Sequence, residues 1–163
     1  MLRPLHLFVC SGNICRSPMA EALAARLYET EAIRADVASA GTLRLRGQPA
    51  AAHAVEAMRL VGLDIARHRS RPLTRELVAR SSVVIVMAPE HERAVHDLDP
   101  ASGGGIVRLW EHAEARAAPR GVPDPIGCDL ETYVRCLELI ESCLTRWLRT
   151  VAKGHGGRGS IGD

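Results

Sequence analysis

The stretch from Cys10 to Ser17, CSGNICRS, constrains the fold more than any other part of the chain. An apolar run, Leu5–Val9, precedes it and predicts a short buried strand. The residues from 17 to about 32 predict a helix with Pro18 in its first turn. A loop between a strand and a helix directs backbone N–H groups, and the positive end of the helix dipole, at one point. The sequence therefore predicts a binding site for phosphate or a similar oxyanion.

Two side chains of this loop carry chemistry. The field that binds an oxyanion also stabilises a thiolate at Cys10. The guanidinium of Arg16 is suited to binding two phosphate oxygens at once. Gly12 and Asn13 are the residue types most tolerant of left-handed backbone, and Ser17 can donate a hydrogen bond to the sulfur.

The spacing Cys-x5-Arg is weak evidence by itself, because Cys143 and Arg149 also satisfy it. The residues between that second pair include no glycine and belong to an amphipathic helical pattern. The strand before and the helix after distinguish the first copy. The ordinary alternative for Cys10 is a small buried hydrophobe at the end of a strand.

Strand and helix patterns alternate along the rest of the chain. They predict an α/β fold, a single-domain four-stranded parallel sheet with helices on both faces and the phosphate loop after the first strand. Further strands are expected at about 35–39, Val83–Met87 and Ile106–Trp110, and further helices at about 49–62, 74–80, 89–98 and 129–152. The domain is expected to span residues 1–153, followed by a disordered glycine-rich tail over 154–163.

Composition excludes several functions. A net charge of +2 and 3% aromatic residues argue against nucleic-acid binding. The five cysteines match neither a disulfide framework nor a Cys-x2-Cys metal site. Neither a signal peptide nor an apolar run of membrane length is recognised. We therefore expect a cytoplasmic protein that binds no membrane, and no metal or other cofactor, since the loop and Arg16 already provide positive potential.

The loop and three other segments resemble the low-molecular-weight protein tyrosine phosphatase family. Val9–Pro18 matches the family signature Val-Cys-x-Gly-Asn-x-Cys-Arg-Ser-Pro without a mismatch. Ser39–Thr42, His68 and Val122–Pro125 match further family segments in the same order, so that the resemblance covers about residues 4–152. It implies hydrolysis of phosphotyrosine in proteins through a phosphocysteine intermediate, with tyrosine-phosphorylated proteins, a tyrosine kinase among them, as partners.

The resemblance also assigns roles to residues. Cys10 is the expected nucleophile and Asp124 the expected general acid, while Arg16 holds the phosphate oxygens. Asn13, Ser17 and His68 are expected to support the loop without touching the substrate. The expected phosphate-binding loop consists of Ser11, Gly12, Asn13, Ile14, Cys15, Arg16 and Ser17.

Two Asp-Pro pairs compete for the role of the acid. Asp99-Pro100 follows a predicted helix and is typical of a surface turn. Asp124-Pro125 follows the fourth strand and a long loop, at the edge of the sheet where the phosphate loop also lies. This position favours Asp124 over Asp99 as the general acid.

Cys15 has two interpretations. A sulfenic acid formed at Cys10 could be captured by Cys15 as a disulfide before further oxidation. Alternatively, Cys15 packs behind the loop. The family resemblance favours the redox role.

Departures from the family pattern affect the substrate. Ile126 and approximately Leu45 stand where many members carry aromatic residues that form walls for a phosphotyrosine ring. Ile14 stands where the related protein arginine phosphatases carry threonine, and an apolar side chain favours phosphotyrosine over phosphoarginine.

Other functions on this loop are less well supported. Thioredoxin-coupled arsenate reductases need a further cysteine pair after the third strand, and residues 81–100 contain no cysteine. A non-catalytic phosphate-binding or redox protein would lose the acid or the nucleophile. A phosphocysteine carrier would need neither Arg16 nor Asp124.

Two further groups of residues are interpreted as surface. His91, Glu92 and His96 resemble a zinc helix motif, but a spacing of five between the histidines favours a solvated helix face. Several arginines fall in two loops near the site, where they either form a solvated face or attract anionic substrates. They are Arg44, Arg46, Arg67, Arg69 and Arg71.

Overall fold

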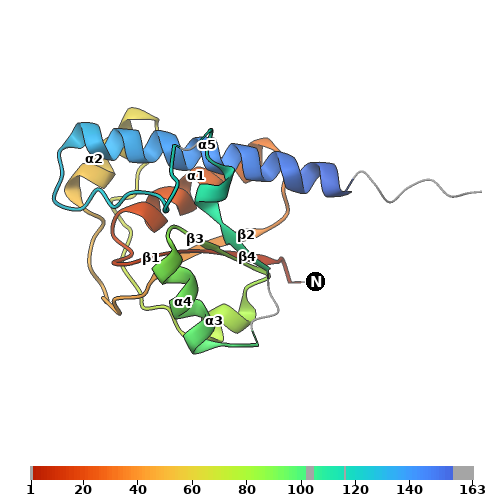
Figure 1. Ribbon diagram of the computed structural model, residues 1–163. Helices are drawn as coiled ribbons and strands as arrows, with labels where there is room; N and C mark the ends of the chain where they lie inside the picture. Colours follow the sequence, from red (N-terminus) through yellow and green to blue (C-terminus); the bar gives the residue numbers. More distant parts are fainter. Residues whose placement is uncertain (1, 102–104, 116, 156–163) are drawn as a thin grey trace, which may run out of the picture.

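A computed structural model describes residues 2–101, 105–115 and 117–155. Four parallel strands form a sheet with helices on both faces (Figure 1), as the sequence predicts. The strands are β1 (Leu5–Cys10), β2 (Asp36–Gly41), β3 (Val83–Val86) and β4 (Gly105–Arg108). The helices are α1 (Arg16–Thr30), α2 (Ala52–Leu60), α3 (Arg75–Arg80), α4 (Pro89–Leu98), the 3₁₀ turn η1 (Leu109–His112) and α5 (Leu130–His155).

The order of the strands decides where a ligand can bind. It is β2-β1-β3-β4, with Cys10 opposite Gly41 on one side and Val9 opposite Val86 on the other. The chain moves outward from β1 to β2 and then returns to the opposite side for β3, so that β1 and β3 flank a reversal in strand order. Ligands of such sheets bind beyond the carboxyl ends of the strands at this reversal. The loop after Cys10 lies there.

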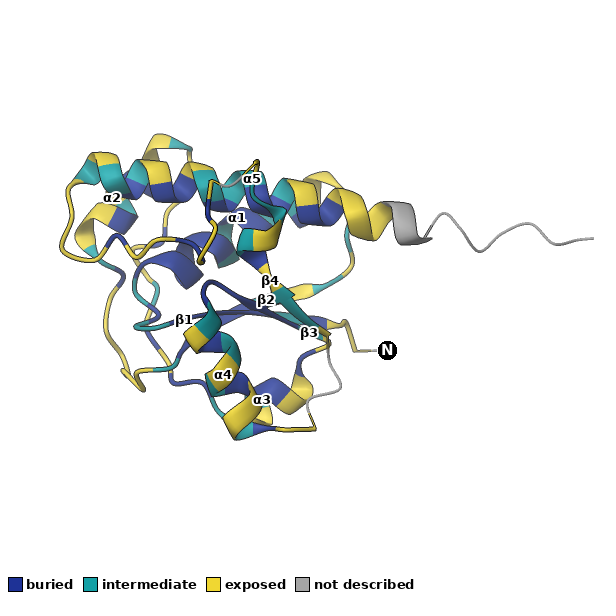
Figure 2. Ribbon diagram, in the orientation of Figure 1, coloured by how far each residue is buried: buried dark blue, intermediate teal, exposed yellow. Residues whose placement is uncertain are grey.

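Alternation along β1 builds a core on each face of the sheet. Leu5, Leu7 and Val9 pack with the residues of α3 and α4, whereas Phe8 and Cys10 face α1 and α5. Figure 2 shows the resulting buried layer between the sheet and the helices. Both faces are covered, which is the environment that a parallel sheet requires.

Apolar residues recur at three- and four-residue steps from Tyr133 to Val151, which predicts one apolar stripe along the last helix, and the structure confirms it over most of its length. Five of its six residues are buried: Tyr133, Leu137, Ile140, Leu144 and Trp147. Val151 is 38% exposed, because the last turns of α5 extend past the sheet (Figure 1). Cys136 and Cys143, which lie on or beside this stripe, are buried core residues.

The structure shifts some element boundaries. The predicted fourth strand, 106–110, ends at Arg108, and Leu109 begins η1, where it is buried. Helix α2 covers only Ala52–Leu60 of the predicted 49–62. Helix α5 continues to His155, and the remainder of the predicted tail, residues 156–163, lies outside the described residues.

Candidate active site

The loop between Cys10 and Arg16 forms an anion cradle. The chain leaves β1 at Cys10 and enters α1 at Arg16, with Asn13 between them in the left-handed region at φ 55°. Within the described part of the chain, no backbone hydrogen bond uses the N–H groups of residues 11–15. These donors, next to the amino end of α1, are therefore available to an oxyanion, as the sequence predicts.

The Cys10 side chain is buried and lies within hydrogen-bonding distance of Ser17. Its Sγ is 2.9 Å from Ser17 Oγ. Asn13 Nδ2 donates to the same Ser17 oxygen at 2.8 Å, so the hydroxyl proton is left for the sulfur.

Asn13 anchors the loop to its surroundings. Its Nδ2 also donates to Ser39 Oγ at 2.9 Å, and its Oδ1 accepts the Arg71 N–H at 3.0 Å. The Asn13 carbonyl lies 2.6 Å from His68 Nε2. Ser17, Ser39, His68 and Arg71 thus all hold Asn13 in place. Arg71 contributes a backbone N–H, which no side-chain pattern in the sequence could have revealed.

Gly41 allows β2 to approach the loop. A Cβ atom at this position would lie 2.7 Å from the Ser11 carbonyl oxygen and 2.9 Å from the Asn13 nitrogen. Since the backbone of the phosphate-binding loop or of β2 would have to move, we expect Gly41→Ala to destabilise the fold by about 1–3 kcal/mol and to weaken binding of inorganic phosphate. Denaturant unfolding and calorimetric titration measure the two effects. Gly105→Ala is the matched control, because no atom of the described residues lies within 4 Å of its Cβ position; an equal effect there would contradict a role of close packing at Gly41.

Arg16 is buried where the loop meets α1, and one of its nitrogen donors has no partner among the described residues. Its Nη1 donates to the Val122 carbonyl at 2.9 Å, and its Nη2 donates to Ser11 Oγ at 3.3 Å and to Asp124 Oδ2 at 3.1 Å. Its Nε is buried without a partner among the described residues. A buried N–H of this kind can bind a phosphate oxygen.

Asp124 reaches the loop because of a contact at the end of β3. The Val122 N–H donates to the Met87 carbonyl at 2.7 Å, which brings the segment before Asp124 to the carboxyl edge of the sheet. The Asp124 side chain is 40% exposed, and its Oδ1 accepts the Ile126 N–H at 3.2 Å. Asp99, the competing aspartate, is buried after α4 and does not line the cavity described next.

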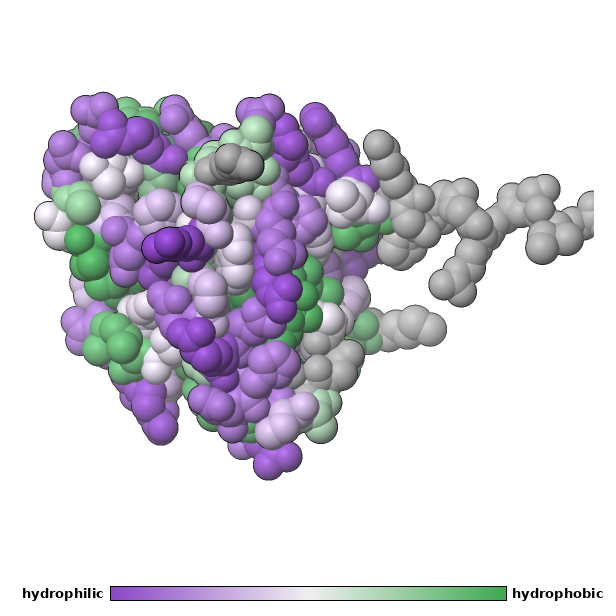
Figure 3. Space-filling model, in the orientation of Figure 1, coloured by the Kyte–Doolittle hydropathy of each residue, from purple (hydrophilic) through white to green (hydrophobic). Residues whose placement is uncertain are grey.

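A cavity of about 210 Å³ opens above the loop. Its walls combine the reactive groups with apolar side chains. The lining residues are Cys10, Ser11, Gly12, Ile14, Cys15, Arg16, Leu43, Leu45, Asp124 and Ile126. Leu45 and Ile126 are placed as predicted, and Leu43, which is 64% exposed, is a wall that the sequence did not indicate. Figure 3 shows apolar patches at the edge of the molecule where the loops after β1 and β2 lie.

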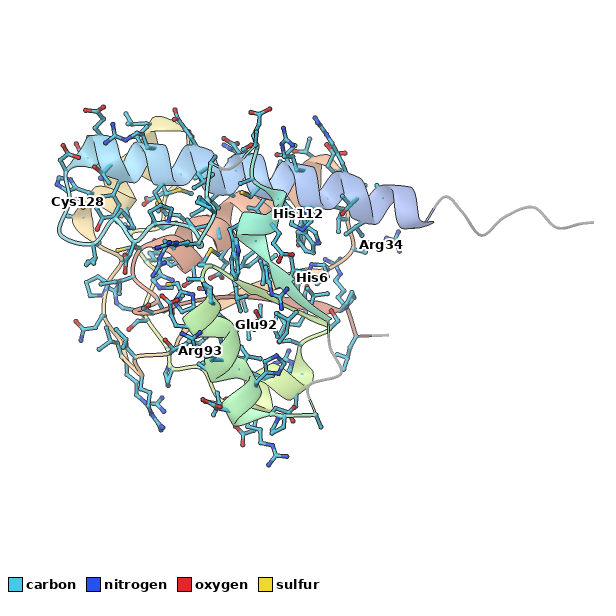
Figure 4. The ribbon with its side chains drawn as sticks, in the orientation of Figure 1. His6, Arg34, Glu92, Arg93, His112 and Cys128 are labelled. Carbon is cyan, nitrogen blue, oxygen red and sulfur yellow. The ribbon has the colours of Figure 1, made fainter. Side chains whose placement is uncertain are left out.

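The prediction that His91 lies on a solvated helix face is wrong. His91 is fully buried in the first turn of α4, and its Nε2 is 2.9 Å from Ser11 Oγ. Burial, together with the Arg16 guanidinium, lowers the pKa of His91 to about 4. Glu92 and His96 lie on the outer face of α4, and Glu92 binds Arg108 of β4 at 2.7 and 2.9 Å (Figure 4).

The other cysteines differ from Cys10 in their surroundings. Burial raises the pKa of Cys15 to about 11, of Cys136 to about 12 and of Cys143 to about 11, so all three are thiols at neutral pH. Cys15 Sγ lies 3.3 Å from the Tyr133 hydroxyl. Cys128 is exposed in the loop before α5 (Figure 4).

Among residues 2–101, 105–115 and 117–155, no group of three or more His, Cys, Asp or Glu side chains is arranged to hold a metal ion. No helix in these ranges is long and apolar enough to span a membrane.

Comparisons with known proteins agree with the geometry. The family model for low molecular weight phosphotyrosine protein phosphatase matches residues 6–156. A probable low molecular weight protein-tyrosine-phosphatase, EpsP, of Ralstonia nicotianae is 37% identical over 142 residues, covering 87% of this chain and 92% of the relative. A protein-arginine-phosphatase of Bacillus subtilis is 32% identical over 149 residues, covering 90% and 96%. The solved low molecular weight protein tyrosine phosphatase of T. tengcongensis superimposes with a TM-score of 0.82 at 30% identity, covering 90% of this chain and 99% of that one.

Proposed function

The chain belongs to the low molecular weight phosphotyrosine protein phosphatase family, and we propose that it hydrolyses phosphotyrosine in proteins through a phosphocysteine intermediate on Cys10. One observation carries the proposal. Cys10, Arg16 and Asp124 line the same cavity, and a hydrogen-bonded ion pair of 3.1 Å joins the last two. A nucleophile, a phosphate-binding cation and a proton donor are therefore within reach of one phosphate monoester.

In the first step, the Cys10 thiolate attacks phosphorus and the bond to the leaving oxygen breaks. The N–H groups of the loop and the Arg16 guanidinium bind the equatorial oxygens, where negative charge develops. When the phosphate binds Arg16, Asp124 is released from its ion pair and takes up a proton from solvent, which it then gives to the departing phenolate.

In the second step, water attacks phosphorus and the bond to Cys10 Sγ breaks. Asp124, now ionised, takes a proton from this water, and phosphate leaves with the thiolate restored. Ser17 donates a hydrogen bond to the sulfur both as leaving group and as nucleophile. The loop and Arg16 supply positive charge throughout, so we expect turnover to persist in excess chelator.

The apolar walls of the cavity support an aromatic substrate. Ile14, Leu43, Leu45 and Ile126 can bury a tyrosine ring, although aliphatic walls select its orientation less than aromatic ones. Phosphoarginine is the second candidate, because one of the relatives is a protein-arginine-phosphatase. Ile14 gives a guanidinium no hydrogen-bonding partner, which favours phosphotyrosine.

A panel of three peptides tests the assignment. Matched phosphotyrosine, phosphoserine and phosphoarginine peptides are incubated with the protein and EDTA, and released phosphate is measured. We expect phosphotyrosine to have the highest kcat/KM. Preference for phosphoarginine would contradict the proposed substrate, and no release from any peptide would contradict the proposed function.

The natural partners follow from the same chemistry. We infer that they are tyrosine-phosphorylated proteins, including a tyrosine kinase whose phosphorylated tyrosines reach the cavity. The free thiols, of which three are buried in addition to Cys10, support a reducing compartment, and we assign the protein to the cytoplasm.

Oxidation tests the role of Cys15. Cys10 and Cys15 are both buried free thiols at the same cavity. If hydrogen peroxide converts the Cys10 thiolate to a sulfenic acid, attack by Cys15 expels water and forms a disulfide. We expect peroxide to inactivate the native protein reversibly, with recovery in dithiothreitol, and to inactivate Cys15→Ala irreversibly.

Cys136→Ala is the matched control, since Cys136 is buried but lies in α5. It should recover as the native protein does. Full recovery of Cys15→Ala, or the absence of a linked peptide in mass spectra of the oxidised native protein, would exclude this protection.

A further inference from the structure

His91 is a buried imidazole that the mechanism above does not use. Its Nε2 lies 2.9 Å from Ser11 Oγ, and the same oxygen lies 3.3 Å from Arg16 Nη2. The Ser11 hydroxyl therefore joins His91 to the guanidinium that binds phosphate. His91 Nδ1 is buried and has no partner among the described residues.

The direction of these hydrogen bonds follows from the chemistry of the groups. A guanidinium only donates, so Ser11 Oγ accepts from Arg16 and its own proton remains for His91. Because the lowered pKa of about 4 leaves the imidazole neutral at pH 7, Nε2 can accept that proton. We accordingly assign the imidazole proton to Nδ1.

Packing alone does not explain a histidine here. A buried polar atom without a partner destabilises the fold, and methionine would fill a similar volume without this cost. The feature that methionine would lack is the acceptor for Ser11.

We propose that His91 is a positioning residue which, through the Ser11 hydroxyl, holds the Arg16 guanidinium in the orientation that binds the phosphoryl group. This inference depends on the proposed function. Arg16 has two anchors besides Ser11, the Val122 carbonyl and Asp124. Asp124 must leave Arg16 to act as the acid, so the Val122 carbonyl at Nη1 and the Ser11 hydroxyl at Nη2 are the anchors that remain, and His91 holds the second of them.

A double-mutant cycle tests the proposal. Ser11→Ala, His91→Met and the double variant are compared with the native protein for kcat and KM on an activated aryl phosphate, for affinity for inorganic phosphate and for Tm. We expect each single variant to lose about ten- to a hundredfold in kcat/KM, with a parallel loss of phosphate affinity. The double variant should be no worse than either single variant, because both remove the same connection.

Stability separates positioning from a structural role. His91→Met should keep or raise Tm, and His91→Gln, which retains an acceptor, should recover part of the activity. Losses that multiply in the double variant, losses that follow Tm, or native kcat in His91→Met would overturn the proposal. The affinity for inorganic phosphate remains a readout if the native protein shows no turnover, so failure of the proposed function would be recognised separately.

A basic cleft of about 300 Å³ supports a second inference, which does not depend on His91. It contains three guanidinium groups and one carboxylate, and none of these four groups takes part in an ion pair with another described residue. The cleft is lined by Arg46, Arg71, Pro72, Thr74, Glu76, Leu77 and Arg80. Of the arginines predicted near the site, Arg46 and Arg71 lie here.

The cleft adjoins the catalytic cavity. Leu45 lines the cavity and the next residue, Arg46, lines the cleft. Arg71 of the cleft is tied to the phosphate-binding loop, because its N–H donates to Asn13 Oδ1, and its Nε donates to the Ser39 carbonyl at 2.8 Å. An extended peptide advances about 3.4 Å per residue, so a peptide with its phosphotyrosine in the cavity can place a nearby side chain in the cleft.

We infer that the cleft binds an acidic side chain next to the phosphotyrosine, which makes acidic phosphopeptides the preferred substrate class. Charge complementarity identifies an acidic side chain as the ligand, since the cleft holds three guanidinium groups without an ion pair among the described residues and only one carboxylate. This inference also depends on the proposed function.

Phosphotyrosine peptides that differ in their flanking residues test this inference. Phosphotyrosine peptides with glutamate or glutamine flanks are compared on the native protein and on Arg46→Gln/Arg80→Gln, with an activated aryl phosphate as reference. At low salt we expect kcat/KM to favour the glutamate peptide by about three- to tenfold in the native protein, and this preference to disappear in the variant and at high salt.

Arg34→Gln is the matched control, because Arg34 is exposed before β2, at the end of the molecule away from the cavity (Figure 4). It should keep the preference, and Arg46→Glu should reverse it in favour of a lysine-flanked peptide. An unchanged preference in Arg46→Gln/Arg80→Gln would overturn the inference. If the native protein does not hydrolyse the aryl phosphate either, the proposed function has failed rather than this inference.

Discussion

Replacing Cys10 with serine is expected to lower turnover of aryl phosphates by about 10⁴-fold or more while leaving the affinity for inorganic phosphate largely intact. Serine keeps the size of the side chain and its contact with Ser17, but it is not ionised at neutral pH. The N–H groups of the loop and the Arg16 guanidinium, which bind the anion, are unchanged. Steady-state kinetics and calorimetric titration with phosphate measure the two quantities on the same preparation.

Two control variants test whether the loss of turnover is specific to the sulfur of Cys10. Cys128→Ser changes an exposed cysteine and should keep native kcat. Cys143→Ser changes a core cysteine and should keep kcat if the protein folds, although its Tm should fall because a hydroxyl replaces a buried thiol. Turnover that survives in Cys10→Ser would refute the phosphocysteine mechanism.

The second large effect is expected at Asp124. Asp124→Asn preserves the shape of the side chain but removes its acidic proton, so phosphotyrosine, whose phenolate is a poor leaving group, should react about 10²–10⁴-fold more slowly. An activated aryl phosphate, whose leaving group needs no protonation, should lose far less. The ratio of kcat for the two substrates therefore isolates proton donation from binding.

Asp99→Asn is the control for this experiment, since it alters the other Asp-Pro pair. It should leave the ratio of the two substrates unchanged, because Asp99 does not line the cavity. Equal losses on both substrates in Asp124→Asn, or a changed ratio in Asp99→Asn, would require another acid.

The parts of the site that the sequence predicts are those whose geometry is local. The phosphate loop, its nucleophile and its arginine lie within one strand–loop–helix unit, and a left-handed residue at Asn13 lets that unit turn on itself. The stripe on α5 is also local, because a repeat near 3.6 residues places its members on one face. Resemblance extended the prediction to His68 and Asp124, which no local pattern connects to the loop.

Only the tertiary structure decided which distant residues meet this loop. The strand order β2-β1-β3-β4 places the ends of β1 and β3 side by side, which brings His91 to Ser11 across 80 residues of sequence. A pattern along α4 could not reveal this, because the hydrogen-bond partner of His91 belongs to the loop after β1. Asp124 contacts Arg16, 108 residues away in the sequence, because the hydrogen bond between Val122 and Met87 brings the segment before Asp124 to the carboxyl edge of the sheet. The sequence alone thus determined the chemistry of the loop, while strand order and long-range backbone contacts determined which side chains act on it.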